Sequence, residues 1–150
     1  MKIEEARCPQ LYADALLALS AAWAEESSCR GYQKNEPDDL KGCRVFLAWE
    51  DENLIGYLLC REGKTAAASS IAPSGTSYVE VDEIYVQPAF RCQGIGKALF
   101  QAMEHQIKCE GIASCIFLTA AAKNSRAILH FYLDELGMEF WHARLFKTLD

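Results

Sequence analysis

The sequence from Tyr78 to Phe100 reads YVEVDEIYVQPAFRCQGIGKALF, and the fold of the whole chain can be worked out from it. Its first part, Tyr78–Val86, is rich in β-branched and aromatic residues and ends just before Pro88, which predicts a strand. A helix is predicted from Ile95 onward, because apolar residues recur there at helical spacing. They are Ile95, Ala98, Leu99, Ala102, Met103 and Ile107. The chain therefore makes a strand, a short turn and a helix in direct succession.

The turn between this strand and this helix combines features that favour an anion. Gly94 and Gly96 have no Cβ, so the backbone can approach a ligand closely. A helix N-terminus adds unpaired N–H groups and partial positive charge, and phosphate is the usual occupant of such a place. Arg91 and Lys97 add full positive charges. The turn is therefore a candidate phosphate-binding loop, with the N–H groups from Gln93 to Ala98 facing the anion.

This stretch resembles the GNAT superfamily of acyl-CoA-dependent N-acetyltransferases. The signature turn of that family is Arg/Gln-x-x-Gly-x-Gly/Ala after a strand that ends in a Val-x-Pro step, and here Arg91–Gly96 follows Val86–Pro88. A second match is Asn124–Tyr132 followed by Leu136–Met138, which is similar to the family's Asn, Ala-Ile, Phe-Tyr and Leu-Gly-Phe pattern. The resemblance implies one GNAT-like domain over residues 1–150, which uses acetyl-CoA and needs no metal.

The resemblance also implies which residues contact coenzyme A. The turn would receive its diphosphate, Asn124 its pantetheine arm, and the backbone N–H of Val86 the oxyanion that forms during acyl transfer. Oxidation or alkylation of Cys92, which lies inside the turn, is expected to block the cofactor. The expected cofactor contacts are Ile84, Tyr85, Val86, Arg91, Cys92, Gln93, Gly94, Ile95, Gly96, Lys97, Ala98, Asn124 and Phe131.

Tyr132 is the candidate general acid, because the tyrosine of the family's Phe-Tyr pair often protonates the departing thiolate. The spacing departs from the usual one. The family's tyrosine commonly lies seven residues after the asparagine, a position that Phe131 holds here. A π-bulge can absorb an extra residue in a helix and is frequent at functional sites. We expect Tyr132 to act as the acid, and the register stays open.

The base that deprotonates the amine is sought among three carboxylates of the central strand, Glu80, Asp82 and Glu83. A primary alkyl amine has a pKa of about 10.4, so only roughly one molecule in a thousand is neutral at pH 7. A nearby carboxylate can accept the excess proton. Polyamine acetyltransferases of the resembling family carry an acidic pair as base and amine anchor, which implies Glu83 and Asp82 as catalytic residues. Glu80, the third carboxylate of the strand, is a candidate substrate contact.

The direction of these carboxylates depends on the strand. Strict alternation would place Glu80, Asp82 and Ile84 on one face, and Val81, Glu83 and Tyr85 on the other. The apolar residues Val81, Ile84 and Val86 do not follow that alternation. A β-bulge would account for the break, and bulges often re-aim side chains near active sites.

Length, charge and cysteine content narrow the class of protein. A chain of 150 residues suits a single domain with a real core. Its net charge of −6 argues against nucleic-acid binding and suits a cationic partner such as an amine. Seven cysteines without metal spacing indicate reduced thiols in a cytoplasmic protein. The apolar run Leu11–Ala24 is too short to span a bilayer, so no membrane partner is expected.

The remaining elements follow in order along the chain, and together they predict a mixed α/β sheet flanked by about four helices. Strands are expected at Lys2–Ala6, Arg44–Glu50, Leu54–Arg61, Ser114–Thr119 and Met138–Leu149; helices at Gln10–Glu26 and Arg126–Leu136, the latter closed by Gly137; and loops at Ser27–Lys41 and Gly63–Ser77. In the resembling family the first helix and the loop after it form much of the acceptor pocket. The candidate substrate contacts there are Trp23, Glu25, Glu26 and Tyr32.

The sequence thus predicts transfer of an acetyl group from acetyl-CoA to a primary amine of a small cationic acceptor, by direct attack. A polyamine, an amino sugar and a lysine-like metabolite all fit. Two alternatives stay open: acetylation of a protein N-terminus or lysine, and a non-catalytic module that binds acyl-CoA as a sensor. The resemblance also makes a homodimer through the final strands an expectation.

Overall fold

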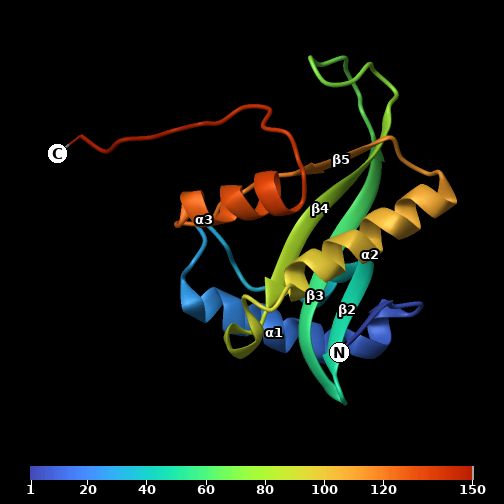
Figure 1. The fold of residues 1–150 in the computed structure, drawn as a ribbon, viewed down its shortest axis with the longest axis vertical. Helices are drawn as coiled ribbons and strands as arrows, with labels where there is room; N and C mark the ends of the chain where they lie inside the picture. Colours follow the sequence, from blue (N-terminus) through green and yellow to red (C-terminus); the bar gives the residue numbers. More distant parts are fainter. Residues whose placement is uncertain (150) are drawn as a thin grey trace.

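The structure is a computed structural model that describes residues 1–149, and it contains one five-stranded mixed sheet in the order β1-β2-β3-β4-β5 (Figure 1). Strands β1 to β4 are antiparallel neighbours, and β5 runs parallel to β4. The strands are β1 Lys2–Glu5, β2 Arg44–Glu50, β3 Asn53–Lys64, β4 Ser77–Val86 and β5 Cys115–Leu118. The helices are α1 Ala13–Glu26, α2 Ile95–Glu110 and α3 Ser125–His130, with short 3-10 turns η1 Pro9–Tyr12, η2 Pro37–Leu40 and η3 Pro88–Phe90 and a π-helical turn η4 Phe131–Glu135.

Each face of the sheet is covered by one long helix. α2 packs against side chains such as Phe46 and Leu58, while α1 packs against Val45 and Leu59. Successive side chains of a strand point to opposite faces, so these two apolar clusters form separate layers. The predicted mixed α/β sheet is confirmed. The predicted number of helices, about four, was slightly too high, since the described residues form three α-helices besides the short turns.

Several boundaries differ from the predicted ones for a physical reason. β3 and β4 form a long hairpin in which Arg61–Lys64 pairs with Ser77–Glu80, so both strands extend into what the sequence predicts as loop. The predicted helix Arg126–Leu136 is α3 followed directly by η4. Gly137 follows this helical segment and has φ +69°, the left-handed conformation that suits glycine after a helix.

The predicted last strand, Met138–Leu149, was wrong. These residues have no strand pairing, and Figure 1 shows the C-terminal segment leaving the body of the molecule. Met138 is partly buried against the α2-side cluster, and the side chains after it are exposed, including Leu145 at 93% and Leu149 at 90%. A strand needs a neighbouring backbone to take up its hydrogen bonds, and one copy of the chain does not bring one to this segment.

A β-bulge in β4 turns Glu83 towards α1. Leu59 pairs with Glu83 and the next residue of β3, Cys60, pairs with Val81, so Asp82 has no partner in the ladder. Val81 therefore shares a face with Ile84 on the α2 side, and Tyr85 belongs to the α1 side. Strict alternation is wrong for this strand, and the bulge indicated by the apolar pattern is confirmed.

β4 and β5 separate before β4 ends. The two strands pair only between Tyr78–Val81 and Cys115–Leu118, and Figure 1 shows them diverging beyond that point. The Gln87 N–H donates to the carbonyl of Ile55 at 2.8 Å, and bonds in an antiparallel ladder alternate along the strand. The N–H and C=O groups of Val86 therefore point away from β3, into the opening between β4 and β5.

Candidate functional site

Glu83 lies at the centre of a hydrogen-bonded cluster on the α1 face. Its carboxylate accepts a bond from the Tyr57 hydroxyl at 2.7 Å and a longer one from the Tyr32 hydroxyl at 3.2 Å. The Asn35 side-chain amide donates to both carboxylate oxygens, at 3.0 and 3.1 Å. Three donors from three different segments of the chain thus fix the position of one carboxylate.

A buried serine supports two of these donors. Ser20, in the middle of α1, is fully buried, and its Oγ lies 2.8 Å from the Tyr32 hydroxyl. The backbone N–H of Asn35 donates to the same Oγ at 2.7 Å. Because Tyr32 donates to Glu83, its oxygen is left to accept from Ser20, so the bonds run in one direction towards the carboxylate.

Burial shifts the protonation of this cluster. It raises the pKa of Glu83, and the bonds from Tyr57, Asn35 and Tyr32 oppose that rise. It also raises the pKa of Tyr32 to about 12 and that of Tyr57 further, so both hydroxyls keep their protons and act as donors. A carboxyl group whose pKa is raised towards neutral pH is a stronger proton acceptor, which is what a general base needs.

The other two candidate carboxylates lie apart from this cluster. Asp82 is exposed at the bulge and pairs with Arg61, whose Nε lies 2.9 Å from a carboxylate oxygen. Glu80 pairs with Phe117 of β5 in the sheet register, and burial followed by repulsion from Asp82 raises its pKa. Neither carboxylate shares a hydrogen-bond partner with Glu83 among the described residues.

An aromatic wall adjoins Glu83. The rings of Trp23 and Tyr32 lie 4.2 Å apart between centroids, and Trp23 stacks on Tyr85 at 5.3 Å. Tyr85 in turn lies 5.9 Å from Tyr57. Two predicted substrate contacts, Trp23 and Tyr32, are thus brought together with Glu83, and aromatic faces favour cationic ligands.

A second carboxylate, that of Glu26, lies at the end of this wall. The Tyr85 hydroxyl donates to Glu26 at 2.8 Å, and the Arg91 guanidinium bonds to both of its carboxylate oxygens at 2.8 Å. The same guanidinium donates from Nε to the Val86 carbonyl at 2.8 Å. Arg91 therefore lies against the end of α1, although the sequence assigns it to the cofactor turn.

The turn before α2 has the backbone that a phosphate needs. Gly94 has φ +78°, and a Cβ at this residue would meet open space. The N–H groups of Ile95, Gly96 and Lys97 begin the helix and have no acceptor within it. The Ala98 N–H is already bonded to the Gly94 carbonyl at 2.9 Å, so it is not free for a ligand. An open glycine turn with three free N–H groups fits the diphosphate of coenzyme A.

Cys92 holds a conformation in this turn that suits glycine better, which gives a stability prediction. Its φ is +59°, and a side chain in the left-handed region costs roughly 1–2 kcal/mol, of which glycine's greater unfolded-state entropy offsets part. We expect Cys92→Gly to raise the free energy of unfolding by about 0.5–1 kcal/mol, measured by urea denaturation. Cys8→Gly is the control, because Cys8 is also exposed but has φ −136°; a gain in both variants would contradict this account.

The predicted Asn124–Tyr132 segment borders the same opening. Asn124 caps α3 by accepting from the Ala127 N–H at 3.2 Å. The Phe131 ring packs over Gly96 so closely that a Cβ added at this glycine would lie 3.3 Å from the ring. The extra residue is absorbed by a π-helical turn that begins at Phe131, as the π-bulge hypothesis requires. Burial raises the pKa of Tyr132 to about 12, so this hydroxyl carries its proton at neutral pH.

Three residues of the site were missed by sequence reasoning: Ser20, Asn35 and Tyr57. Asn35 gives no local signal, since it lies in a polar loop 48 residues from Glu83. Ser20 could have been suspected, because a polar residue on the apolar face of a helix needs a partner. Tyr57 lies in an apolar strand, where it is indistinguishable from a core residue.

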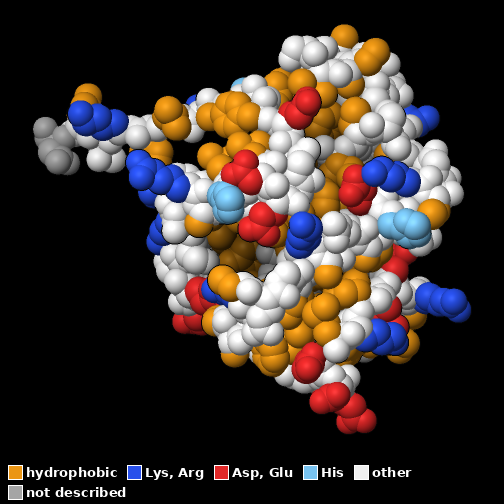
Figure 2. Space-filling view, viewed as in Figure 1, with side chains coloured by type: hydrophobic (Ala, Val, Ile, Leu, Met, Phe, Trp, Pro, Cys, Tyr) orange, Lys and Arg blue, Asp and Glu red, His pale blue; other side chains and the backbone are white. Residues whose placement is uncertain are grey.

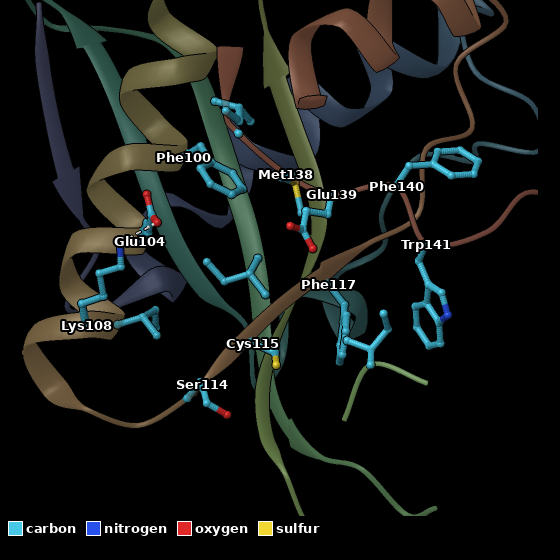
Figure 3. A pocket seen from close by; sticks show the side chains of 16 residues that line it. Phe100, Glu104, Lys108, Ser114, Cys115, Phe117, Met138, Glu139, Phe140 and Trp141 are labelled. Carbon is cyan, nitrogen blue, oxygen red and sulfur yellow. Dashed lines mark hydrogen bonds and ion pairs between the residues drawn. The ribbon is translucent and has the colours of Figure 1, made fainter. Parts of the chain in front are cut away.

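Two hollows lie outside the cluster. One, of about 660 Å³, adjoins Asn35 and is lined by Glu25, Glu36 and Asp39 among others. The other, of about 480 Å³, is a mostly apolar groove between α2, β5 and Met138–Trp141 (Figure 3). Figure 2 shows apolar side chains gathered on this view of the molecule and on the projecting C-terminal segment. The acidic hollow, not the apolar groove, is on the side of Glu83.

Residues 1–149 contain neither a group of metal ligands nor a membrane-spanning helix. No group of three or more histidine, cysteine or acidic side chains is arranged to hold a metal ion there. Within the same residues, none of the helices has the length and apolar character needed to cross a bilayer. All seven cysteines are free thiols.

Solved structures with this fold include several acetyltransferases. An aminoglycoside acetyltransferase from an uncultured soil metagenomic sample, solved with trehalose, has a TM-score of 0.67 at 20% identity and covers 99% of this chain and 96% of its own. A ribosomal-protein-alanine N-acetyltransferase from Brucella melitensis biovar Abortus 2308 gives 0.67 at 19%, covering 99% and 100%. An aminoglycoside N-acetyltransferase solved with CoA gives 0.68 at 16%, covering 99% of both chains.

The comparison with family profiles decides the assignment. At these identities the solved structures show the fold alone, and a comparison with curated proteins gives no significant match. The profile of the acetyltransferase (GNAT) family, however, matches residues 9–138, which include α1, the glycine turn, α3 and the π-helical turn. This chain belongs to the acetyltransferase (GNAT) family.

Proposed function

We propose that this protein transfers an acetyl group from acetyl-CoA to a primary amine of a small cationic acceptor, by direct attack of the amine. The observation that supports this most is the buried Glu83 carboxylate, held by Tyr32, Asn35 and Tyr57 beside an aromatic wall. Such a site can bind an ammonium group and then accept its proton. The cytoplasm suits the seven free thiols.

The cofactor would be held by the turn and the opening between β4 and β5. The N–H groups of Ile95–Lys97 would receive the diphosphate, with Arg91 and the Lys97 side chain adding charge. Neighbouring contacts would come from Ile84, Tyr85, Cys92, Gln93, Gly94, Asn124 and Phe131. Holding the two reactants in a fixed orientation can supply several kcal/mol of the barrier, so these contacts contribute to catalysis.

A residue of this chain can be proposed for each remaining step. Acetyl-CoA, when bound, supplies the thioester carbonyl that the amine attacks. Glu83 would accept the ammonium proton, and the Val86 N–H, which points into the opening, would donate to the acetyl oxygen as it gains negative charge. As the C–S bond breaks, Tyr132 would donate its proton to the departing thiolate, and its phenolate would regain a proton from the acetylated nitrogen, which must lose one to become the amide. Asp82, paired with Arg61 at the surface, is left as a less suitable base.

The acceptor is best described by its charge. Glu26 and Glu83 lie along the wall formed by Trp23, Tyr32 and Tyr85. The charged residues that line the neighbouring hollow are three acids and one lysine: Glu25, Glu36, Asp39 and Lys34. Polyamines, amino sugars and lysine-like metabolites share the required positive charge. An acyl acceptor on a protein is a second candidate, since one structural neighbour is a ribosomal-protein-alanine N-acetyltransferase.

The test is a thiol-release assay with acetyl-CoA and a panel of polyamines, aminoglycosides, lysine derivatives and N-terminal peptides. We expect turnover on cationic small molecules and little on neutral peptides. Turnover on peptides alone would favour the protein acceptor. Tight coenzyme A binding, seen by calorimetry, without turnover on any amine would indicate a binding module instead.

Asn35 should act as a positioning residue for Glu83, which gives a pH prediction. Its two bonds to the carboxylate lower the pKa of Glu83, so Asn35→Ala should raise that pKa further. The acidic limb of the kcat/KM profile should therefore move to higher pH, because the base stays protonated, and so inactive, up to a higher pH. Gln33→Ala, an exposed change in the same loop, is the control. An unmoved limb in Asn35→Ala would contradict the assignment of Glu83.

We also propose that two copies associate through their C-terminal segments. Met138–Leu149 exposes apolar side chains, while β5 is the last strand of the sheet and borders the apolar groove. If this segment of one copy lay against β5 of the other, it would cover both the apolar side chains of the segment and the exposed edge of β5. Sedimentation equilibrium should show a dimer that is lost when residues 142–150 are removed; a monomer in the intact chain would overturn this.

A further inference from the structure

The Arg91–Glu26 pair joins the two halves of the site. Glu26 is the last residue of α1, on the acceptor side, and Arg91 precedes the glycine turn, on the cofactor side. Two bonds of 2.8 Å connect them, and the Arg91 guanidinium also lies 5.5 Å from the centroid of the Tyr85 ring. The Glu26 side chain is only 21% exposed and that of Arg91 is 41% exposed, so this is a well-formed pair.

The guanidinium shows what kind of group this place accepts. It is a cation that contacts the Glu26 carboxylate and faces the ring of Tyr85, on which Trp23 also stacks. Charge, ring face and partial burial all favour a positive ligand over a neutral one. Without Arg91, the same surroundings would take an ammonium or guanidinium group of a ligand.

Arg91 cannot contact Glu26 and the diphosphate of coenzyme A fully at the same time. Nη2 bonds to the carboxylate and Nε to the Val86 carbonyl, so only Nη1 is free, and both edges of the guanidinium that could bind a phosphate through two nitrogens include the occupied Nη2. We propose that Glu26 and Tyr85 form a cation subsite for the acceptor, which Arg91 fills in the free protein and leaves when the diphosphate binds. This inference rests on the proposed function and adds an order of binding and a substrate class.

Two consequences follow from this exchange. Coenzyme A must break an ion pair to bind, and by doing so it frees a carboxylate for the acceptor. The acceptor should therefore bind more tightly after coenzyme A, and it should carry a second positive charge besides the amine at Glu83. Coupling of this kind is reciprocal, so each ligand strengthens the binding of the other by the same factor.

Calorimetry with coenzyme A tests the first consequence. Glu26→Gln should bind coenzyme A about two- to fivefold more tightly than wild type, because no ion pair opposes the move of Arg91. Glu25→Gln is the matched control, since it removes the same charge from an exposed neighbour that pairs with no described residue. In an Arg91→Gln background the gain from Glu26→Gln should disappear. Pantetheine, which lacks the diphosphate, should bind all variants alike.

Calorimetry with spermidine, a small polycation, tests the second consequence. Wild type should bind spermidine more tightly when coenzyme A is present, and Glu26→Gln should lose that difference. Equal gains in coenzyme A affinity from Glu25→Gln and Glu26→Gln, or a gain that persists without Arg91, would overturn the exchange. A spermidine affinity that does not change when coenzyme A is added, or when Glu26 is replaced, would also overturn it. Failure of wild type to bind coenzyme A at all would instead overturn the proposed function.

Discussion

We expect Glu83→Gln to lower kcat by about two to four powers of ten, the usual contribution of a general base. Glutamine keeps the size of the side chain and can still accept from Tyr57, but it cannot take the ammonium proton. Coenzyme A affinity should hardly change, because Glu83 lies on the α1 face and not in the glycine turn. Steady-state kinetics and calorimetry on the same preparation separate the two effects.

Matched variants in the same strand make this result specific. Glu80→Gln and Asp82→Asn each remove one carboxylate from β4 without touching the cluster around Glu83. We expect both to keep kcat within about tenfold of wild type, within the range of indirect effects. A large loss in Asp82→Asn together with a small one in Glu83→Gln would mean that the base is Asp82.

Glu83 also gives the stability of the protein a distinctive pH dependence. Burial raises the pKa of this carboxyl in the folded state above its ordinary value of 4.5. The folded protein therefore binds the proton more tightly than the unfolded chain, and stability decreases as the pH rises from about 4.5 through the raised pKa. Urea denaturation across this window should show a shallower decrease in Glu83→Gln, provided that the variant folds.

Tyr132→Phe is expected to lower kcat by about two powers of ten, since the leaving thiolate loses its proton donor. The change removes one hydroxyl that has no hydrogen bond among the described residues, so the fold should be unaffected. The high pKa of this tyrosine, raised by burial, keeps the proton available at neutral pH. Single-turnover kinetics with a good amine substrate would measure the chemical step directly.

The neighbouring residue supplies the control for the register. Phe131 occupies the position at which the family's tyrosine commonly lies, and its ring packs over Gly96. If Tyr132 is the acid, Phe131→Tyr added to Tyr132→Phe should not restore activity. Full activity in Tyr132→Phe would show that the acid lies elsewhere, and rescue by the double variant would place it at residue 131.

The central unit could be predicted well because its signals are local. The end of β4, the glycine turn and the start of α2 each have their own residue pattern within Tyr78–Gly96, and the structure has them where the sequence predicts. The bulge in β4 and the π-helical turn at Phe131 were also indicated, the first by broken alternation and the second by a spacing one residue too long. Irregularities leave a trace in sequence when they shift a strong pattern.

The rest depends on contacts that no local pattern reports. Asn35 reaches Glu83 from a loop whose path is set by Ser20 and by the pairing of Cys29 with Ala122. The segment Met138–Leu149 has strand-forming residues, but whether a strand forms depends on a partner backbone. Arg91 was assigned to phosphate from its place in the turn, and only the fold brings it to Glu26.

The unpaired residue Asp82 is an extra residue that the pairing of β4 with β3 does not use. Without it, Val81 would still pair with Cys60 and Glu83 with Leu59, so its removal would give a regular ladder in which both side chains keep their faces. Removal of Val81 instead would bring Asp82 to the apolar α2 face. A library of β4 variants should therefore tolerate both substitution and deletion at position 82, and no deletion at position 81.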